Sequence, residues 1–110
     1  HFSIKYGIHV NANMEIGKGL CIVHSDCVYL NASKIGDNFT CYPGVMVGAS
    51  KGNKPLIEND VTVYTGAVVV GNITLYSGCS VGANAYVGND VPPDTTVVGL
   101  PARPIHKRKQ

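Results

Sequence analysis

A single histidine interrupts an otherwise apolar stretch of the chain, GLCIVHSDCVYL at residues 19–30. This residue, His24, carries a ring with an ordinary pKa of about 6.5, so its neutral form can accept a proton at physiological pH. A positioned proton acceptor of this kind can act as a general base, for example on a hydroxyl that attacks a carbonyl. Whether His24 is placed for such chemistry depends on the fold, which the period of the sequence around it predicts.

The apolar residues recur every six positions, whereas one face of a helix recurs about every 3.6. A first row keeps this step apart from a slip of one residue before Ile35 and a longer gap before Ile57. Its members are Val10, Ile16, Ile22, Val28, Ile35, Cys41, Val47, Ile57, Val63, Val69, Leu75, Val81 and Val87. A second row of small or apolar residues follows most of them by four positions: Ala32, Val45, Val61, Ala67, Ile73, Cys79, Ala85 and Val91.

A six-residue period is typical of a solenoid built from very short strands and tight turns. Three units form one triangular coil of about eighteen residues, the first row points inward, and coils stack at roughly 4.8 Å. Glycine and asparagine in GDN, GN, EN and GND supply the positive φ that the corners need. The sequence therefore predicts one all-β domain over residues 1–110, with about four to five coils over residues 10–92 and a C-terminal tail at 93–110.

Two irregularities in the repeat are the expected places for chemistry. One is the extra residue between Val28 and Ile35, and the other is the step of ten residues between Val47 and Ile57. The second predicts a protruding loop at about 48–56, exposed and mobile because it is polar and rich in Gly and Lys. We interpret it as a flap over an active site, with a neutral insertion as the alternative. His24 is the third residue of its unit, so we expect it at an outward-facing corner.

Composition excludes several classes of function. The net charge is +2 and the charged fraction 15%, and such a neutral surface is often covered by a second copy of the chain. The basic tail HKRKQ is too short to indicate nucleic-acid binding. No apolar run is long enough for a membrane span, and no signal peptide is visible, although the chain starts at His1 and could be a trimmed piece.

The four cysteines form no C-x-x-C pair, and we interpret them as reduced and buried, as in a cytoplasmic protein. Cys21 and Cys27 could be considered as acyl carriers, but no basic partner is placed to form a thiolate. The chain also lacks the histidines of a zinc site, which needs three here. Only His9 and His24 lie in the repeats, whereas His1 and His106 lie at the ends, so we expect no metal.

The repeats, of the form [IV]-G-x-x-[small]-x, resemble those of the hexapeptide-repeat acyltransferases, which fold as left-handed parallel β-helices. The closing segment DVPPDTTVVGLPARPI is very similar to the end of the serine acetyltransferase and sugar O-acetyltransferase branch. In that family GKGLxIxH carries the catalytic histidine, and residues 17–24 read GKGLCIVH. The resemblance implies that His24 is the general base of a direct acetyl transfer without an acyl-enzyme. Two other functions are possible for the same β-helix. One is that of a zinc-dependent γ-type carbonic anhydrase, and the other is that of a non-catalytic scaffold.

The residue that orients His24 stays open. In serine acetyltransferases, the residue about fifteen positions before the catalytic histidine looks like an aspartate that orients its ring. This chain has His9 at that position. His9 could form a hydrogen bond with His24, as a second catalytic residue, or lie at a subunit interface. Asp26 and Glu15 are other candidates, without a spacing argument for either.

The resemblance also implies acetyl-CoA as co-substrate, bound between two β-helices of a homotrimer. The pantetheine arm is expected along backbone groups at small residues: Gly48, Ala49, Thr65, Gly66 and Ala83. The segment GLPAR, with Gly99, Pro101 and Arg103, is similar to the part that meets the nucleotide, and Lys107 and Arg108 could reach its phosphates. Ordinary coil packing is the alternative for the small residues.

The acceptor is predicted from two departures from the family pattern. Serine acetyltransferases carry Asp-His where this chain has Val23-His24, and Arg-His-Pro where it has Asn53-Lys54-Pro55. Because both charge partners of a zwitterion are missing, a neutral sugar hydroxyl of a polysaccharide precursor is favoured, and serine is the alternative. The expected contacts with sugar oxygens are Asn11, Tyr42, Asn53 and Lys54.

Overall fold

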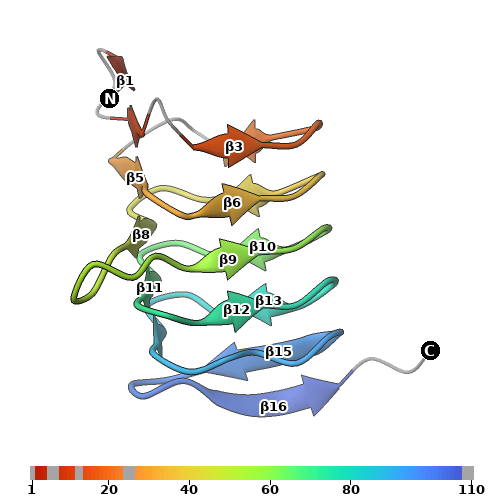
Figure 1. The fold of residues 1–110 in the computed structure, drawn as a ribbon. Helices are drawn as coiled ribbons and strands as arrows, with labels where there is room; N and C mark the ends of the chain where they lie inside the picture. Colours follow the sequence, from red (N-terminus) through yellow and green to blue (C-terminus); the bar gives the residue numbers. More distant parts are fainter. Residues whose placement is uncertain (1, 5–7, 12–13, 24–26, 108–110) are drawn as a thin grey trace.

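The structure is a computed structural model that describes residues 2–4, 8–11, 14–23 and 27–107. Residues 2–4, 8, 9, 106 and 107 are described through their backbone alone. Short strands stack into a column with three faces, and the turns between the faces lie above one another (Figure 1). The predicted β-solenoid is therefore confirmed. No helix of the described residues is long and apolar enough to cross a membrane.

Each face of the column is one sheet. Sheet A contains β1 (Phe2–Ile4), β2 (Ile8–Val10), β5 (Val28–Leu30), β8 (Met46–Gly48), β11 (Val68–Val70) and β14 (Tyr86–Val87). Sheet B contains β3 (Glu15–Ile16), β6 (Lys34–Ile35), β9 (Leu56–Ile57) and β12 (Thr74–Leu75). Sheet C contains β4 (Cys21–Ile22), β7 (Thr40–Cys41), β10 (Thr62–Val63), β13 (Ser80–Val81), β15 (Thr95–Val98) and β16 (Arg103–Lys107). Pairing is parallel except for β1 with β2 and β15 with β16.

The turns between the sheets form three corners, which we number for use below. Corner 1 joins sheet C to sheet A and holds residues 23 and 27, 42–45, 64–67 and 82–85. We count with it residues 99–102, the turn between β15 and β16 of sheet C, because Tyr86 holds this turn at the same edge through hydrogen bonds with Gly99 and Ala102. Corner 2 joins sheet A to sheet B and holds residues 11–14, 31–33, 49–55, 71–73 and 88–90. Corner 3 joins sheet B to sheet C and holds residues 17–20, 36–39, 58–61, 76–79 and 91–94.

Both predicted rows of apolar residues point into the column. From Val28 onward every first-row residue is buried, and so are the second-row residues from Ala32 to Val91. Val10, Ile16 and Ile22 in the first coil are only partly buried. The core is thus a narrow aliphatic column, in which Phe39 is the one aromatic side chain among the buried residues.

The register differs from the sequence prediction at one position. Leu30, not Val28, is the partner of Val10 and Val47 across sheet A. Six residues, 23–28, therefore separate Ile22 from Tyr29, whereas four residues, 42–45, separate their partners Cys41 and Met46. The extra length belongs to the turn before β5 rather than to the segment after it. Sequence could not locate it, because Val28 and Leu30 both point inward on a strand that alternates sides.

The predicted loop leaves the column between β8 and β9 (Figure 1). We call residues 49–55 the flap. Ser50 and Asn53 exchange two backbone hydrogen bonds of 2.9 and 3.0 Å around Lys51 and Gly52. Both central residues have positive φ, 53° and 81°, as in the type I′ turns of two-residue hairpins. The flap is exposed as expected, but it is a hydrogen-bonded hairpin rather than an irregular loop.

The C-terminal segment also differs from a simple tail. β15 pairs in parallel with β13, so residues 95–98 add a further strand to sheet C. The chain then reverses at Gly99, which has a φ of 98°, and β16 returns antiparallel to β15. A hairpin therefore closes this end of the column.

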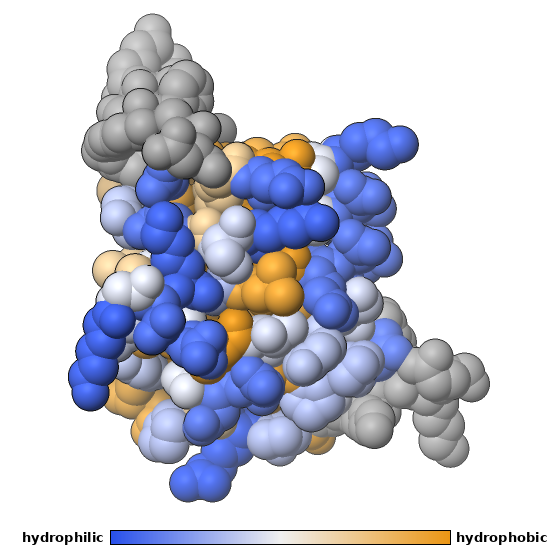
Figure 2. Space-filling model, viewed as in Figure 1, coloured by the Kyte–Doolittle hydropathy of each residue, from blue (hydrophilic) through white to orange (hydrophobic). Residues whose placement is uncertain are grey.

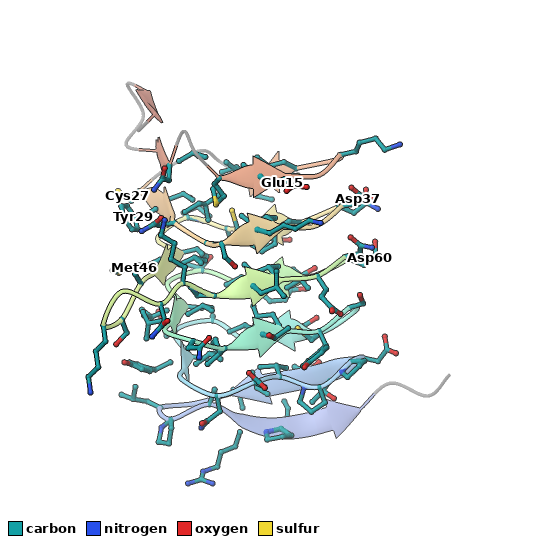
Figure 3. The ribbon with its side chains drawn as sticks, viewed as in Figure 1. Glu15, Cys27, Tyr29, Asp37, Met46 and Asp60 are labelled. Carbon is teal, nitrogen blue, oxygen red and sulfur yellow. The ribbon has the colours of Figure 1, made fainter. Side chains whose placement is uncertain are left out.

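Corner 3 shows why glycine follows the inward residue in several units. The Lys18 N–H donates to Asp37 Oδ1 at 2.8 Å, and the Asp37 N–H donates to Asn59 Oδ1 at 2.7 Å. A Cβ placed on Gly17 would collide with Asp37 Oδ1, and one on Gly36 would collide with Asn59 Oδ1. Each carboxylate or amide thus occupies the space that a glycine of the preceding coil leaves free. Asp37 and Asp60 lie above one another at this edge in Figure 3.

Candidate active site

His24, the predicted general base, lies outside the described residues, and so does the side chain of His9. In the sequence His24 falls between β4 and β5, and the described residues on either side of it are Val23 and Cys27. Val23 is partly buried, whereas Cys27 is exposed and has a positive φ of 49°. Six residues separate Ile22 from Tyr29, two more than separate their partners Cys41 and Met46 in the next coil. The chain between Ile22 and Tyr29 therefore departs from the repeat where the sequence places His24.

Corner 1 brings together six of the residues predicted from sequence: Tyr42, Thr65, Gly66, Ala83, Gly99 and Pro101. The turns are joined by backbone hydrogen bonds, from Gly66 N to Pro43 O at 3.0 Å and from Asn84 N to Thr65 O at 2.8 Å. Thr65 and Ala83 are exposed at the apex. Small residues therefore run along this edge of the column.

The closing hairpin belongs to the same edge. Tyr86 N donates to Gly99 O at 3.0 Å, and Ala102 N donates to Tyr86 O at 2.9 Å. These two bonds hold residues 99–102 against the end of corner 1. Arg103 is exposed at the start of β16, and the backbone of Lys107 lies in the same strand.

The other predicted residues lie at corner 2, across sheet A from corner 1. Gly48 ends β8, and Ala49, Asn53 and Lys54 belong to the flap. Asn11 lies on the same corner in the first coil, where its Nδ2 donates to Asn31 Oδ1 at 3.0 Å. One protomer therefore does not bring the predicted site together.

A hollow of about 340 Å³ opens beside the flap, and sequence reasoning missed part of its lining. The flap contributes Ser50, Lys51 and Asn53. The column contributes Val70, Gly71, Asn72, Ile73, Tyr86 and Gly88. The step of ten residues signalled the flap, but nothing in the repeat marked Tyr86 or Gly71 as its neighbours.

Charge is unevenly distributed over the described side chains. Asp37, Asp60 and Asp94 belong to corner 3, whereas the flap carries Lys51 and Lys54 and no acid. On sheet B, Lys34 Nζ lies 3.6 Å from Glu15 Oε2, both largely exposed. Figure 2 shows hydrophilic side chains along the corner 3 edge and an apolar patch in the middle of the sheet B face. The flap is thus a cationic projection away from the acidic edge.

A second hollow, of about 350 Å³, lies between sheet B and corner 3 and contains no predicted site residue. Lys34, Leu56 and Glu58 line it. Glu58 Oε1 accepts hydrogen bonds from Ser77 N at 3.1 Å and Ser77 Oγ at 3.3 Å. This carboxylate therefore serves the turn of the next coil. Among the described side chains, which do not include those of His9 and His24, no cluster of His, Cys, Asp or Glu could hold a metal ion.

The cysteines are free, as predicted, but only two of the four are buried. Cys21 and Cys27 are exposed because Cys21 points outward from β4 and Cys27 lies in the longer turn of corner 1. Burial raises the pKa of the Cys41 thiol to about 12, and burial likewise raises the pKa of Cys79 to about 12. These two thiols stay protonated at neutral pH and cannot act as nucleophiles.

The two buried thiols predict a loss of stability in alkali. Below pH 9.0, the ordinary pKa, both states keep the protons, and between about pH 9 and 12 only the unfolded chain loses them. The free energy of unfolding therefore falls as pH rises, by up to about 1.4 kcal/mol per pH unit for each thiol. Urea unfolding at several pH values measures this slope. The double variant Cys41→Ala, Cys79→Ala should show a shallower slope, and equal slopes would contradict the assignment.

Comparisons with known proteins place this column among acetyltransferases. No family model matches the chain. The serine acetyltransferase of Bacillus licheniformis is 38% identical over 104 residues, covering 90% of this chain and 48% of the relative. That of Staphylococcus xylosus is 40% identical over 100 residues, covering 86% and 46%. This chain thus spans about half the length of these relatives.

Solved structures give the same result and add the handedness of the helix. Neisseria gonorrhoeae serine acetyltransferase superposes with a TM-score of 0.88 at 30% identity, over 94% of this chain and 43% of that one. Soybean serine acetyltransferase complexed with serine superposes with a TM-score of 0.78 at 36% identity, over 84% and 40%. A serine acetyltransferase complex with CoA also matches, with a TM-score of 0.78 at 29% identity, over 84% and 39%. The column is a left-handed parallel β-helix of about four turns.

Proposed function

Within the hexapeptide-repeat acyltransferase family, to which this chain belongs, we propose that the protein transfers an acetyl group from acetyl-CoA to the hydroxyl of L-serine. The observation that carries the proposal is the 38–40% identity to serine acetyltransferases along 86–90% of the chain. The sugar acceptor favoured by the sequence analysis has no support among these relatives, so serine takes its place.

His24 acts as the general base in this proposal. The neutral ring takes the proton of the serine hydroxyl while the oxygen attacks the thioester carbonyl, and CoA leaves as the thiol. Both substrates are held in line, so positioning supplies much of the rate and no acyl-enzyme forms. The protonated thiols of Cys41 and Cys79 agree with a route that does not pass through cysteine.

Acetyl-CoA is placed along corner 1 from the turn that contains His24 towards the closing hairpin. Thr65, Gly66, Ala83 and Gly99 lie on this path, and small side chains allow the donor to approach the backbone. Arg103, at the closing end, suits the nucleotide phosphates because a guanidinium binds phosphate with two hydrogen bonds. This placement also accounts for the position of the GLPAR segment at the end of the same corner.

The site is completed by a second copy of the chain, and we propose a homotrimer. Tyr29, Met46 and Tyr86 project from sheet A with 41%, 44% and 39% of their surface exposed, and its strands β5, β8, β11 and β14 carry no charged residue. Tyr29 and Met46 lie one above the other in Figure 3. Packing this face against another copy places corner 2 and its flap beside the neighbour's corner 1. Light scattering that gives a stable monomer would contradict this assembly.

We infer that lysines of the flap bind the serine carboxylate, a charge partner that the sequence analysis counted as missing because the flap lacks the Arg-His pair of the serine acetyltransferases. Lys51 and Lys54 are exposed on it, and no acid of the flap neutralises them. Val23, in contrast, offers no charge to the serine ammonium group, and this residue keeps a neutral sugar hydroxyl as the second candidate.

The test is thiol release from acetyl-CoA with a panel of acceptors: L-serine, simple hexoses, N-acetylhexosamines and nucleotide sugars. We expect release with L-serine and formation of O-acetylserine, identified by mass. Release with a sugar alone would overturn serine as the acceptor and support the sugar hydroxyl that the sequence analysis favoured. No release with any acceptor, together with no binding of CoA, would support a non-catalytic column instead.

A further inference from the structure

The flap is bonded to the column at both ends, and by two different coils. Pro55, its last residue, is buried, and its carbonyl oxygen accepts hydrogen bonds from Ser33 N at 2.8 Å and from Ser33 Oγ at 3.0 Å. Gly48, just before the flap, is also buried, and its carbonyl oxygen accepts a hydrogen bond from Gly71 N at 3.2 Å. Ser33 belongs to the coil before the flap and Gly71 to the coil after it. The base of the flap is therefore fixed between the coils on either side.

The repeat does not require the hydroxyl of Ser33. In the register of sheet B, Met14, Pro55 and Ile73 stand at the same position, just before the other three strands of the sheet. None of these three side chains carries a hydroxyl. The N–H of Ser33 already joins its coil to the next one, so the hydroxyl adds a second bond to the same carbonyl. This second bond is made only to the coil that carries the flap.

Lys54 is the cation of the flap that lies next to this bond. Asn53, on one side of Lys54, belongs to the closed hairpin through its two backbone hydrogen bonds with Ser50. Pro55, on the other side, restricts the residue before it to extended conformations. The backbone of Lys54 is thus fixed on both sides, whereas its side chain is exposed. Lys51 lies at the apex of the hairpin, away from the base of the flap.

We propose that Ser33 is a positioning residue for the acceptor and that it acts through Lys54. The Ser33 hydroxyl holds the carbonyl of Pro55 and so fixes the direction in which the flap presents the Lys54 ammonium group to the carboxylate of L-serine. This inference rests on the proposed function, in which lysines of the flap bind that carboxylate. A fixed backbone lowers the cost of ordering a flexible lysine on binding. The effect should therefore appear in the binding of the acceptor and not in the chemical step.

The test compares Ser33→Ala with the unmodified protein on two acceptors, L-serine and L-serinamide, which has no carboxylate. We expect the KM for L-serine to rise about fivefold, the usual effect of one hydrogen bond, while kcat stays within about twofold. The kcat/KM for L-serinamide should not change. Ser33→Thr keeps the hydroxyl and should keep the KM for L-serine. Ser77→Ala is the matched control, because its hydroxyl bonds Glu58 at corner 3, and it should leave both acceptors unaffected.

A double variant separates an action through Lys54 from a general effect. Lys54→Met removes the ammonium group and should raise the KM for L-serine by at least about tenfold, because a hydrogen bond to a charged group is lost. Adding Ser33→Ala to Lys54→Met should then cause no further rise, because both changes act on the same contact.

Each other outcome decides against the inference. Equal losses with the two acceptors, or a loss of kcat that accompanies a lower Tm, would show that Ser33 only stabilises the corner. Additive losses in the double variant would mean that Ser33 does not act through Lys54. No thiol release with L-serine by the unmodified protein would overturn the proposed function and this inference with it. Release with L-serine and an unchanged KM in Ser33→Ala would overturn this inference alone, so the two failures are distinguishable.

Discussion

His24→Ala is expected to lower kcat/KM for the acetylation of L-serine by about 10²–10⁴-fold, the usual contribution of a general base. The loss should be in kcat, because the ring acts on the serine proton in the transition state and leaves the donor path along corner 1 intact. The unmodified protein should lose kcat/KM as pH falls through about 6.5, because the protonated ring cannot accept a proton. Steady-state rates of thiol release between pH 5.5 and about 8.5 measure both effects.

His9→Ala is the matched control for this prediction. The backbone of His9 lies in β2, paired with Tyr29 of β5, and the sequence left its role open. A loss of kcat in this variant with the trimer intact would make it a positioning residue for His24, whereas dissociation would place it at the interface. If His24→Ala keeps more than about a tenth of the activity and the same pH profile, another group is the base.

Phe39→Ala is expected to lower the free energy of unfolding by about 3–5 kcal/mol. Phe39 is completely buried, and the register places it between Leu20 of the preceding coil and Val61 of the next. Its neighbours cannot move in to fill the space, because backbone hydrogen bonds such as Cys21 N to Phe39 O, at 2.8 Å, fix the separation of the coils. Most of the lost volume should therefore remain as a cavity.

Urea unfolding followed by circular dichroism measures this change, with Phe39→Leu as the control. Leucine keeps an apolar side chain close to the original volume, so the expected loss is below about 1.5 kcal/mol. A loss below about 1 kcal/mol for Phe39→Ala would mean that the column can contract around the missing ring.

The inner rows of the fold were readable from sequence because only an inward position selects apolar residues every six positions. The register at Leu30 was not, since Val28 and Leu30 both suit the core and the count from Ile22 allowed either. The length of the flap followed from the step between Val47 and Ile57. The hairpin of the flap depends on a positive φ at Lys51, which a lysine does not predict. The exposure of Cys21 and Cys27 was missed for a similar reason, because cysteine is usually buried.

The candidate site was predictable in its parts but not in its arrangement. Thr65 and Ala83 share corner 1 as small residues in corresponding turns, which the repeat predicts. Gly48 and Asn53 were placed with them, although the fold puts sheet A between the two groups. That separation depends on which two sheets each turn joins. The six-residue period of one chain also does not predict the contacts between copies.

The stacking of coils has a consequence for the length of molecule that the protein can recognise. In sheet C, four steps separate β4, beside the turn that contains His24, from β15, beside the closing hairpin. At the usual spacing this is about 19 Å. If the donor follows corner 1, the number of coils sets the length of the donor that the column can bind. Removing one coil would shorten it by roughly 4.8 Å and leave the reacting end untouched, so the protein's preference for a carrier of given length would be set by counting turns of backbone.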